Sequence, residues 1–231
     1  MKLSLVMPVY NEGGTLEEIL KRLGQVDLPV SWELIVVDDG SDDDAVDHIQ
    51  RDWVPTAERV TVVKADTNRG KGSALRKGFS LAHGDILGVQ DADLEYDPNE
   101  IPRLLAPMLD GRAEVVFGTR EFGAHASYSF WYVVGNRLVS LFASALFDRY
   151  ITDAYTCYKF FTRHRYDQLR LTADGFEIEA ELAGGLLRTG ARVYEIPIDY
   201  AARGREEGKK IRARDGVRGL VRLLRIRLRG W

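Results

Sequence analysis

Apolar runs of strand length alternate with helical patterns through the first half of the chain. Five runs rich in valine, isoleucine and leucine have the pattern of strands, at residues 3–9, 32–37, 60–64, 86–89 and 115–117. Between them, helical patterns cover residues 16–23, about 43–52 and about 71–82, and Pro98 opens a further helix. Strands that alternate with helices of this length predict right-handed βαβ units around a parallel sheet, and therefore an α/β fold.

The second half of the chain is less regular. An apolar helical stretch covers residues 130–147 and is interrupted at Gly135-Asn136-Arg137, and a further helix is predicted at 177–187. Strands are predicted at 158–161 and 193–198, and from Asp215 onward the chain has the pattern of one helix. We find no internal repeat and no low-complexity linker between the halves. We therefore predict a single domain over residues 1–231, in which the second half completes a cleft.

Composition changes this picture little. The 231 residues are 45% hydrophobic and 29% charged, as in an ordinary globular protein, and the net charge of −3 does not favour nucleic-acid binding. The lone Cys157 excludes an intramolecular disulfide and a cysteine-cluster metal site, and we interpret it as a small buried residue. No apolar run approaches the roughly 18 residues of a membrane span. The first residues have the pattern of a strand rather than a signal peptide, so we expect a cytoplasmic protein, with peripheral membrane contact left open.

Three acidic side chains follow a short buried strand. Asp91, Asp93 and Glu95 come directly after residues 86–89, where ionised carboxylates are costly unless a positive charge meets them. Alternate residues of an extended segment point the same way, so we expect the three to converge on one point. Hard oxygen ligands suit Mg²⁺ or Mn²⁺, with water or phosphate oxygens in the remaining positions. We interpret the stretch as a clamp for a metal-bound diphosphate; the alternative is a set of solvated loop acids.

Other strands also end in polar clusters. Parallel sheets bind ligands at the carboxyl ends of their strands, and three further clusters fall there: Asn11-Glu12, Asp38-Asp39 and Asn68-Arg69. Asp39 is a candidate acceptor for a hydrogen bond from a nucleobase or ribose, although Asp38, Asp39 and Asp42 are also the pattern of a helix N-cap cluster. Gly70-Lys71-Gly72 lacks the upstream glycine of a Walker A loop. It is either a phosphate or ribose contact through backbone N–H groups or a plain turn.

Arginines form the second set of candidates. Arg120 ends the fifth predicted strand, and Arg137 lies within the apolar stretch 130–147, where it needs an anionic partner. That partner is either an internal aspartate or a ligand. Asp153 is a candidate general base that would activate a hydroxyl acceptor. The charged loop 203–210 is either a solvated loop or a lid in which Arg203 and Lys210 neutralise a leaving diphosphate.

The C-terminal helix is basic and amphipathic. One predicted stripe holds Val217, Leu220, Leu224, Leu228 and Trp231, and an adjacent one holds Arg218, Arg222, Arg225 and Arg229. Such a helix can lie on an anionic membrane. The alternative is that its apolar stripe packs on the domain and the arginines face water.

Segments along nearly the whole chain resemble the motifs of family 2 glycosyltransferases with the GT-A fold. The first half contributes Val6-Met7-Pro8-Val9-Tyr10-Asn11-Glu12, Val36-Val37-Asp38-Asp39-Gly40-Ser41, Asn68-Arg69-Gly70-Lys71-Gly72 and Asp91-Ala92-Asp93. The second half narrows the likeness to dolichol- or polyprenol-phosphate mannose and glucose synthases through Gly118-Thr119-Arg120, Asn136-Arg137, Thr152-Asp153 and Glu195-Ile196-Pro197-Ile198 with Arg203.

This resemblance implies a Rossmann-like three-layer αβα sandwich with a mixed, mostly parallel central sheet. It implies metal-dependent, inverting transfer of a hexose from a nucleotide sugar to a polyprenyl or dolichyl phosphate, with mannose from GDP-mannose as the expected donor. Residues 1–120 would then bind the nucleotide sugar, residues 121–210 would face the acceptor, and residues 211–231 would form the basic helix.

Motifs and resemblance together predict the site. The nucleotide-sugar contacts are expected at Pro8, Tyr10, Glu12, Asp39, Lys71, Asp91, Ala92, Arg203 and Lys210. Asp91, Asp93 and Glu95 would hold Mg²⁺ or Mn²⁺ on the diphosphate, and Arg120 and Arg137 would hold the acceptor phosphate. The residues expected to take part in catalysis are Asp93, Arg120, Arg137 and Asp153.

Three rival functions remain open at this point, together with a binding module that has no catalytic activity. The donor is alternatively UDP-glucose, and the acceptor is alternatively a soluble hydroxyl compound with Asp153 as the base. A different class is a sugar-nucleotidyltransferase, which also uses metal carboxylates on an αβα sheet. Those enzymes have a basic, glycine-rich loop after the first strand, whereas Tyr10-Asn11-Glu12 is acidic.

Overall fold

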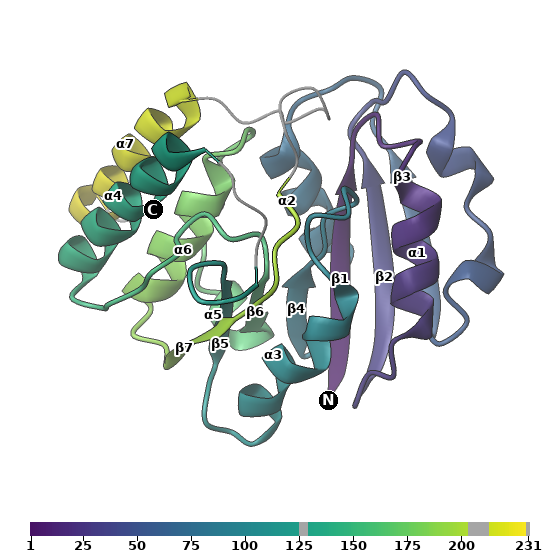
Figure 1. Cartoon of the computed structure of the whole chain (residues 1–231), viewed down its shortest axis with the longest axis horizontal. Helices are drawn as coiled ribbons and strands as arrows, with labels where there is room; N and C mark the ends of the chain where they lie inside the picture. The colour runs from purple at the N-terminus through teal and green to yellow at the C-terminus, as the bar shows by residue number, and fades with distance from the viewer. Residues whose placement is uncertain (125–128, 203–212, 230–231) are drawn as a thin grey trace.

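A seven-stranded sheet runs through the middle of the molecule in the order β3-β2-β1-β4-β6-β5-β7 (Figure 1). The computed structural model describes residues 1–124, 129–202 and 213–229. Its strands are β1 (Lys2–Val9), β2 (Ser31–Asp38), β3 (Arg59–Lys64), β4 (Ile86–Val89), β5 (Val115–Thr119), β6 (Lys159–Thr162) and β7 (Val193–Pro197). Among these strands β6 alone runs antiparallel to its neighbours, β4 and β5. The predicted mixed, mostly parallel sheet is confirmed.

Helices cover both faces of the sheet and complete three layers. One hydrophobic core lies between the sheet and two helices, α1 (Leu16–Gln25) and α3 (Ile101–Leu109). The other core lies beneath α2 (Lys71–Leu81), α4 (Phe130–Phe147), α6 (Ile178–Arg188) and α7 (Ala213–Arg229), with the short α5 (Arg163–Tyr166) at its edge. The two cores and the strand order explain why the chain forms one sandwich.

The central strand β1 is buried on both faces. Leu3, Leu5 and Met7 belong to the core beneath α1 and α3, whereas Val6 belongs to the other core. This is the continuous apolar pattern that parallel strands require when helices cover both sides. Helix α2 packs so closely on β1 that a Cβ added at Gly78 would lie 2.2 Å from Val6. The tight packing holds the beginning of α2, including Lys71, near the carboxyl edge of the sheet.

Two local predictions were wrong. Residues 43–52 were expected to form a helix, but they contain two short 3₁₀ turns, Ala45–His48 and Arg51–Trp53. The acids before them are held by the loop after β1: Asp42 Oδ2 accepts a hydrogen bond from the side chain of Asn11, and Asp43 Oδ2 accepts one from the backbone N–H of Gly13. Side chains fixed in this way compete with the start of an α-helix. The expected interruption of residues 130–147 is also absent, because α4 continues through Gly135 without a break.

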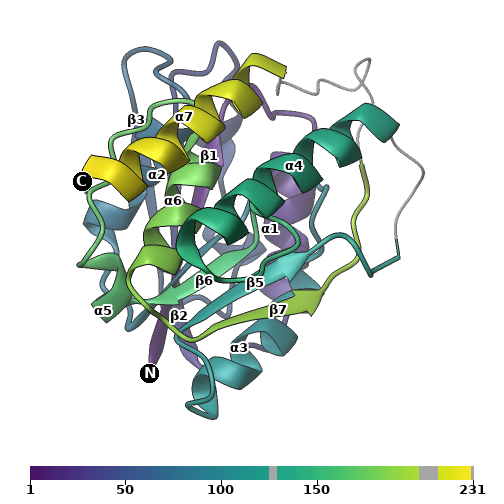
Figure 2. The same ribbon diagram turned by 90° about the vertical axis from the view of Figure 1, so that its left-hand side faces the viewer.

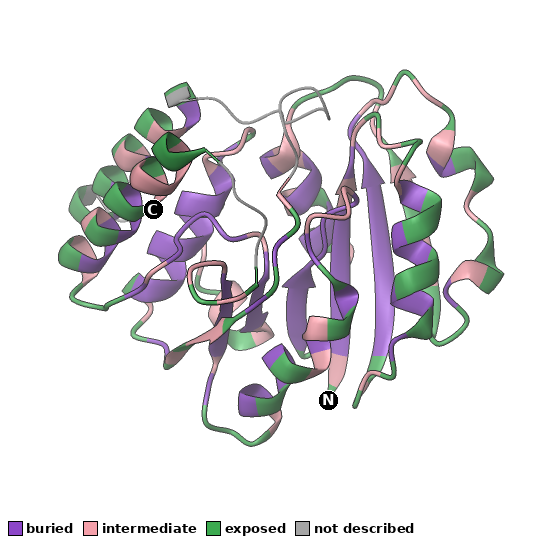
Figure 3. Ribbon diagram, in the orientation of Figure 1, coloured by how far each residue is buried: buried purple, intermediate pink, exposed green. Residues whose placement is uncertain are grey.

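Helices α4 and α7 lie side by side on the outside of α6 (Figure 2). Helix α6 is almost entirely buried, while much of the outer surface of α4 and α7 is exposed (Figure 3). By length and composition alone, α4 would suffice to cross a membrane, and 22% of it is buried inside the fold. The expectation that no apolar segment approaches that length therefore needs correction.

Helix α7 carries two apolar stripes rather than one. Gly219, Leu223 and Ile226 are buried against the fold. Of the predicted stripe, Val217, Leu224 and Leu228 are exposed and Leu220 is half-buried. Val221, which was not assigned to this stripe, is exposed beside them. The alternative that this stripe packs on the domain is therefore wrong for Val217, Leu224 and Leu228. Trp231 lies outside the described residues.

Candidate active site

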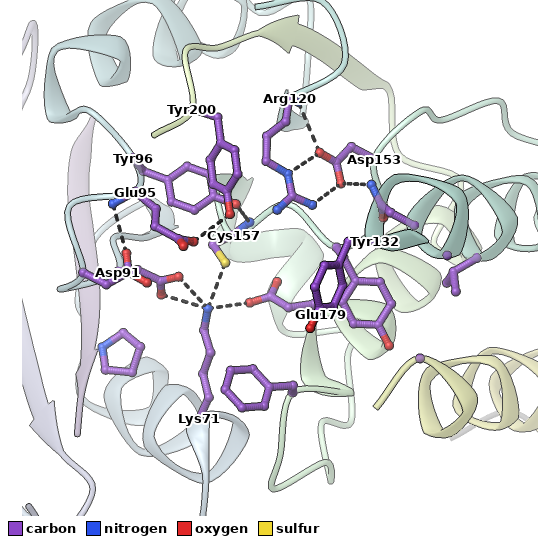
Figure 4. Close-up of a pocket in the computed structure, with 18 of the residues that line it drawn as sticks. Lys71, Asp91, Glu95, Tyr96, Arg120, Tyr132, Asp153, Cys157, Glu179 and Tyr200 are labelled. Carbon is purple, nitrogen blue, oxygen red and sulfur yellow. Dashed lines mark hydrogen bonds and ion pairs between the residues drawn. The ribbon is translucent and has the colours of Figure 1, made fainter. Parts of the chain in front are cut away.

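A cleft of about 1010 Å³ opens at the carboxyl ends of β1, β2, β4 and β5 (Figure 4). The predicted nucleotide-sugar residues that the structure describes all line it: Pro8, Tyr10, Glu12, Asp39, Lys71, Asp91 and Ala92. Asp93, Glu95, Arg120, Arg137 and Asp153 line the same cleft. Arg203 and Lys210 lie outside the described residues. The structure thus brings together the polar clusters that follow separate strands, as expected for a parallel sheet.

Lys71 lies at the centre of a buried ionic cluster. Its Nζ is 2.8 Å from Asp91 Oδ1 and 2.9 Å from Asp91 Oδ2, and 2.9 Å from Glu179 Oε1. Glu179 also pairs through Oε2, at 2.7 Å, with the fully buried Lys159. Two ammonium groups and two carboxylates therefore alternate in one series of ion pairs. We call these four residues the lysine cluster: Lys159, Glu179, Lys71 and Asp91. Its formal charges cancel.

Electrostatics keep Lys71 and Glu179 of the lysine cluster charged. Burial lowers the pKa of Lys71, but the charges of Asp91 and Glu179 outweigh it and hold this pKa well above the ordinary value. Burial raises the pKa of Glu179, but Lys159 and Lys71 outweigh it, so that pKa is lowered. Cys157 Sγ lies 3.0 Å from Lys71 Nζ, and burial raises the pKa of this thiol well above the ordinary value. Cys157 is therefore a neutral neighbour of the ammonium group.

Arg120 and Asp153 form a second ionic cluster across the cleft. The guanidinium donates from Nε to Asp153 Oδ2 at 2.7 Å and from Nη2 to Oδ1 at 2.8 Å. Asn136 of α4 donates a third bond to Oδ1 at 2.8 Å. Burial raises the pKa of Asp153, but the Arg120 charge and these hydrogen bonds outweigh it, so the pKa is lowered. We call Arg120, Asp153 and Asn136 the arginine cluster.

The three acids after β4 do not converge as predicted. Leu94 has a φ of +62°, in the left-handed region that non-glycine residues rarely occupy, so the segment bends instead of continuing as a strand. Asp93 Oδ1 accepts the backbone N–H of Glu95 at 3.2 Å, and Glu95 Oε2 accepts the hydroxyl of Tyr200 at 2.7 Å. Within residues 1–124, 129–202 and 213–229, no three His, Cys, Asp or Glu side chains are arranged to hold a metal ion.

The acids nevertheless fit a divalent ion that arrives with a ligand. Asp91, Asp93 and Glu95 all line the cleft, and the buried Asp91 Oδ1 has no hydrogen-bond partner in the described chain, although the Lys71 charge lies beside it. Mg²⁺ is commonly bound by one or two carboxylates together with substrate phosphates, rather than by a cage of protein ligands. The donor set fits that arrangement and not a preformed three-carboxylate site.

Asp39 connects two loops at the edge of the cleft. Its carboxylate accepts the backbone N–H groups of Arg69, at 3.1 Å, and Gly70, at 2.6 Å. Asp38 instead accepts from the backbone and hydroxyl of Ser41. Neither aspartate caps a helix, so the N-cap alternative is wrong for this pair. Asp39 lines the cleft while it holds the loop that leads to Lys71.

The glycines around Lys71 are needed for packing. A Cβ added at Gly70 would lie 2.4 Å from the carbonyl oxygen of Asp174, and one at Gly72 would lie 2.3 Å from that of Ala173. Gly70 also has a φ of +109°. The Gly-Lys-Gly pattern thus allows the segment at 173–174 to pack closely on the beginning of α2.

Arg137 differs from Arg120 in its surroundings. Its side chain is 63% exposed, and its partner is Glu121 rather than an internal aspartate. Both Arg137 and Glu121 line the cleft. Arg137 therefore lies at the solvent side of the cleft, where an anionic ligand would compete with Glu121 for the guanidinium.

Sequence reasoning missed several residues of the cleft. Glu179 was assigned only to a helix, although an acid at the start of an otherwise apolar helix was the available signal. Tyr96 packs against Tyr200, with ring centroids 5.3 Å apart, and Arg120 stacks over Tyr200 at 5.0 Å. These residues come from distant segments of the sequence, so no spacing pattern predicts that they lie in contact. Cys157, expected to be a small buried residue, lines the cleft and is half-buried.

Comparison with known proteins gives a consistent result. The family model for glycosyl transferase family 2 matches residues 4–169. A dolichol-phosphate mannosyltransferase from Pyrococcus furiosus is 28% identical over 214 residues, which are 90% of this chain and 59% of that protein. An undecaprenyl-phosphate 4-deoxy-4-formamido-L-arabinose transferase from Klebsiella pneumoniae is 38% identical over 112 residues, 48% of this chain and 34% of that protein. The chain thus spans less than two thirds of the length of either relative.

A solved structure of similar fold is glucosyl-3-phosphoglycerate synthase from Mycobacterium tuberculosis, in complex with Mn²⁺, UDP and glucosyl-3-phosphoglycerate. It has a TM-score of 0.68 and 23% identity, and covers 98% of this chain and 79% of that chain. The likeness confirms the predicted GT-A fold. Because the matched residues 4–169 include the sheet from β1 to β6 and the strand ends that form the cleft, the chain belongs to glycosyl transferase family 2.

Proposed function

We propose that this chain transfers a hexose from a nucleotide sugar to a polyprenyl or dolichyl phosphate, with inversion at the anomeric carbon. Mannose from GDP-mannose is the proposed donor. The names of the two relatives support a polyprenyl-phosphate acceptor, and the Pyrococcus relative supports mannose. Both matches cover only part of the relatives, so the proposal depends on the cleft itself.

The observation that carries the proposal is the opposition of two walls in one cleft. Asp39, Asp91 and Asp93 line the wall at the ends of β2 and β4, where a sugar nucleotide and its cation would bind. Arg120 lies across the cleft from Asp91 (Figure 4), and Arg137 of α4 lines the same cleft; we call the side that these arginines line the acceptor wall. Cations opposite a donor site are what a phosphate acceptor requires, because planar guanidinium groups bind phosphate oxygens in pairs.

The chemistry needs positioning more than proton removal. A phosphate monoester has its second pKa near 6, so it is already a nucleophile at neutral pH. One of its oxygens would attack the anomeric carbon while the bond to the nucleoside diphosphate breaks. Arg120 uses Nε and Nη2 on Asp153, which leaves Nη1 for an acceptor oxygen. Asp153 and Asn136 would thus fix the direction of the guanidinium, and Arg137 would complete the acceptor site.

A divalent cation, Mg²⁺ or Mn²⁺, would neutralise charge on the departing diphosphate. Asp91 and Asp93 would hold it, with Glu95 nearby on the same wall of the cleft. Arg203 and Lys210 are proposed to approach the same diphosphate. Pro8, Tyr10, Glu12 and Asp39 are proposed to surround the base and ribose.

The arginine cluster argues against a hydroxyl acceptor with Asp153 as general base. Both oxygens of that carboxylate accept bonds from Arg120, one also accepts from Asn136, and its pKa is lowered. A general base works best with a pKa near the working pH. Asp153 is therefore better suited to orient Arg120 than to accept a proton.

The proposed function is tested with the purified chain, Mn²⁺, a short polyprenyl phosphate, and GDP-mannose or UDP-glucose. We expect a lipid-linked hexose phosphodiester and release of a nucleoside diphosphate. The Arg137→Ala variant should lower kcat/KM for the lipid phosphate by about tenfold or more, the value of one charged hydrogen bond. Release of pyrophosphate would indicate a nucleotidyltransferase, and transfer only to hydroxyl acceptors, unaffected by Arg137→Ala, would contradict the lipid-phosphate assignment.

We also propose that the protein rests peripherally on the inner face of a membrane, where its acceptor would reside. The exposed apolar residues of α7 are Val217, Val221, Leu224 and Leu228, and exposed arginines flank them: Arg218, Arg225 and Arg227. The described part of α7 has one acid, Asp215, which is buried. Anionic lipid headgroups would complement this charge, and the apolar stripe would enter the interface.

Helix α4 extends the same surface toward the cleft. It exposes Phe130, Trp131, Leu138 and Leu141, and it packs beside α7, where Arg227 Nε donates to the carbonyl oxygen of Leu146 at 2.9 Å. We call the exposed apolar residues of α4 and α7 the helical platform. Trp131 also lines the cleft, so an isoprenoid chain lying in the membrane would approach the acceptor wall along α4.

Vesicle sedimentation tests the helical platform. The chain should bind vesicles that contain phosphatidylglycerol and bind phosphatidylcholine vesicles more weakly, with binding reduced by salt. The double variant Leu141→Asp, Leu224→Asp should lose binding, whereas the exposed β3 control Val62→Asp should retain it. Equal vesicle binding by the double variant and the Val62→Asp control would contradict the proposal. It would also be contradicted if the wild type and the control were dimers and the double variant a monomer, because the helical platform would then contact a second copy of the chain.

A further inference from the structure

The lysine cluster places a protein cation on the carboxylate that the proposed metal ion needs. Lys71 Nζ is within 2.9 Å of both oxygens of Asp91, and Asp91 lines the cleft. Figure 4 shows the ammonium group between Asp91 and Glu179, with the Cys157 sulfur on a third side. A divalent cation on Asp91 would add two positive charges to a cluster whose charges already cancel.

We infer that Lys71 is a resident counter-cation that couples metal binding to diphosphate binding. Without a nucleotide, the ammonium group neutralises Asp91 and disfavours a free divalent ion. When a diphosphate arrives with the ion, its negative charge compensates for the added cation, and Lys71 can transfer from Asp91 to a phosphate oxygen. The inference rests on the proposed nucleotide-sugar function and assigns Lys71 a regulatory part within it.

The structure supports exchange at Lys71 rather than a fixed bond. A lysine ammonium is a compact charge on a flexible four-carbon chain, so it can change partners with little change in the backbone. Its other anchors remain when Asp91 is released, because Glu179 Oε1 lies 2.9 Å from Nζ and Cys157 Sγ lies 3.0 Å away. Glu179 is in turn held by the buried Lys159. The ammonium can therefore leave Asp91 without losing every partner.

The coupling makes opposite predictions for two substitutions. Lys71→Met removes the counter-cation, so Asp91 should bind Mn²⁺ alone more tightly. Glu179→Gln removes a negative charge that shares Lys71, so the ammonium should pair with Asp91 more strongly and Mn²⁺ should bind more weakly than in the wild type. A purely structural role for either residue would not shift Mn²⁺ affinity in opposite directions.

Mn²⁺ titration followed by electron paramagnetic resonance of the free ion tests the inference, with and without GDP or UDP. In the wild type, the nucleoside diphosphate should tighten Mn²⁺ binding by about tenfold or more, within the usual range for coupled ligands. In Lys71→Met, Mn²⁺ alone should bind about tenfold more tightly than in the wild type, and the effect of the nucleotide should shrink. Lys77→Met, at an exposed position of the same helix, is the matched control and should behave as wild type.

The outcomes separate the inference from the function on which it rests. Nucleotide-dependent Mn²⁺ binding that is unchanged in folded Lys71→Met would overturn the role of Lys71 and leave the donor site intact. Absence of Mn²⁺ and nucleotide binding in the wild type would overturn both. If Lys71→Met does not fold, as judged by thermal melting, Glu179→Gln decides alone: tighter or unchanged Mn²⁺ binding would contradict the inference.

Discussion

The two ionic clusters of the cleft both pair buried charges, but they do so with different geometries. In the lysine cluster, one ammonium group serves two carboxylates and a thiol. In the arginine cluster, one guanidinium is matched to one carboxylate by two bonds of 2.7 and 2.8 Å, and Asn136 fixes that carboxylate from the other side. The first arrangement allows partners to be exchanged, whereas the second defines a direction.

This difference fits the two halves of the proposed reaction. The donor side must accept a cation and a diphosphate and then release the diphosphate, so a mobile charge is useful there. The acceptor side must hold a nucleophilic phosphate in one orientation, for which a guanidinium with a fixed plane is suited. The same contrast predicts which cluster is structurally costly to break.

The largest effect is expected from the arginine cluster. Arg120→Ala leaves Asp153, which is 1% exposed, without its charged partner, and removing one member of a buried ion pair typically costs about 3–5 kcal/mol. Urea unfolding should therefore show a loss of that size. Arg120→Lys keeps the charge without the two-bond geometry and should recover only part of it. A loss below about 1 kcal/mol in Arg120→Ala would show that the pair is not a structural unit.

A smaller effect is expected from Lys71→Met. Neither of its carboxylate partners is left as a fully buried, unpaired charge. Glu179 still pairs with Lys159, and the side chain of Asp91 is 12% exposed to solvent at the cleft. We expect a loss of about 1–3 kcal/mol in the free energy of unfolding. Added Mn²⁺ should restore part of the stability of Lys71→Met and none of that lost in Arg120→Ala. Equal rescue of both variants in thermal melts would remove the distinction between the clusters.

Acid should weaken both clusters, in a definite order. The folded pKa values of Asp153 and Glu179 are lowered from ordinary values of 3.8 and 4.5. Each carboxylate therefore contributes stability above its ordinary pKa and loses that contribution as the pH falls through the lowered value. The stability difference between wild type and Asp153→Asn should stay constant from about pH 8 to about pH 5 and shrink below about pH 4.

The matched comparison is wild type against Glu179→Gln in the same acid titration. The difference in stability between wild type and Glu179→Gln should begin to shrink at a higher pH than the difference between wild type and Asp153→Asn. The reason is that the ordinary pKa of glutamate is higher than that of aspartate. A stability difference that grows on acidification would show that these carboxylates are not ionised in the folded protein. Unfolding by urea at several pH values provides the measurement.

The smallest effect is expected from a surface pair outside the cleft. Lys21 and Glu17, four residues apart on α1, have side chains that are 46% and 57% exposed. Water and salt screen such pairs, so Glu17→Ala should leave the urea midpoint of unfolding close to that of the wild type. A loss comparable to that of Lys71→Met would mean that burial is not what distinguishes the cleft clusters.

The sequence was sufficient to predict the alternation of strands and helices in the first half of the chain, and the predicted site residues that the structure describes all line the cleft. Asp39, Lys71, Asp91 and Arg120 follow or neighbour strand ends, and a parallel sheet gathers such positions at one edge. Local geometry was harder to predict. The turn at Leu94 and the 3₁₀ turns at 45–53 depend on contacts with distant loops, which override the pattern of neighbouring residues.

The ion-pair partners of Glu179 could not be predicted from spacing in the sequence. It lies 108 positions after Lys71 and 20 after Lys159, and no periodic pattern connects the three. Packing of α6 beside α2 brings them together, and a glycine at position 72 allows the approach of residues 173–174. The partners of a buried charge are therefore a property of packing.

By itself, the sequence determined the α/β alternation, the family motifs and the edge of the sheet where the site lies, because hydrophobic period and strand-end polarity are local properties. Only the tertiary structure decided which charges pair, that Asp153 is bound to Arg120, and that an apolar stripe of α7 faces outward. The physical reason is that ion pairing and burial depend on distances between segments, and those distances are fixed only when helices pack on the sheet.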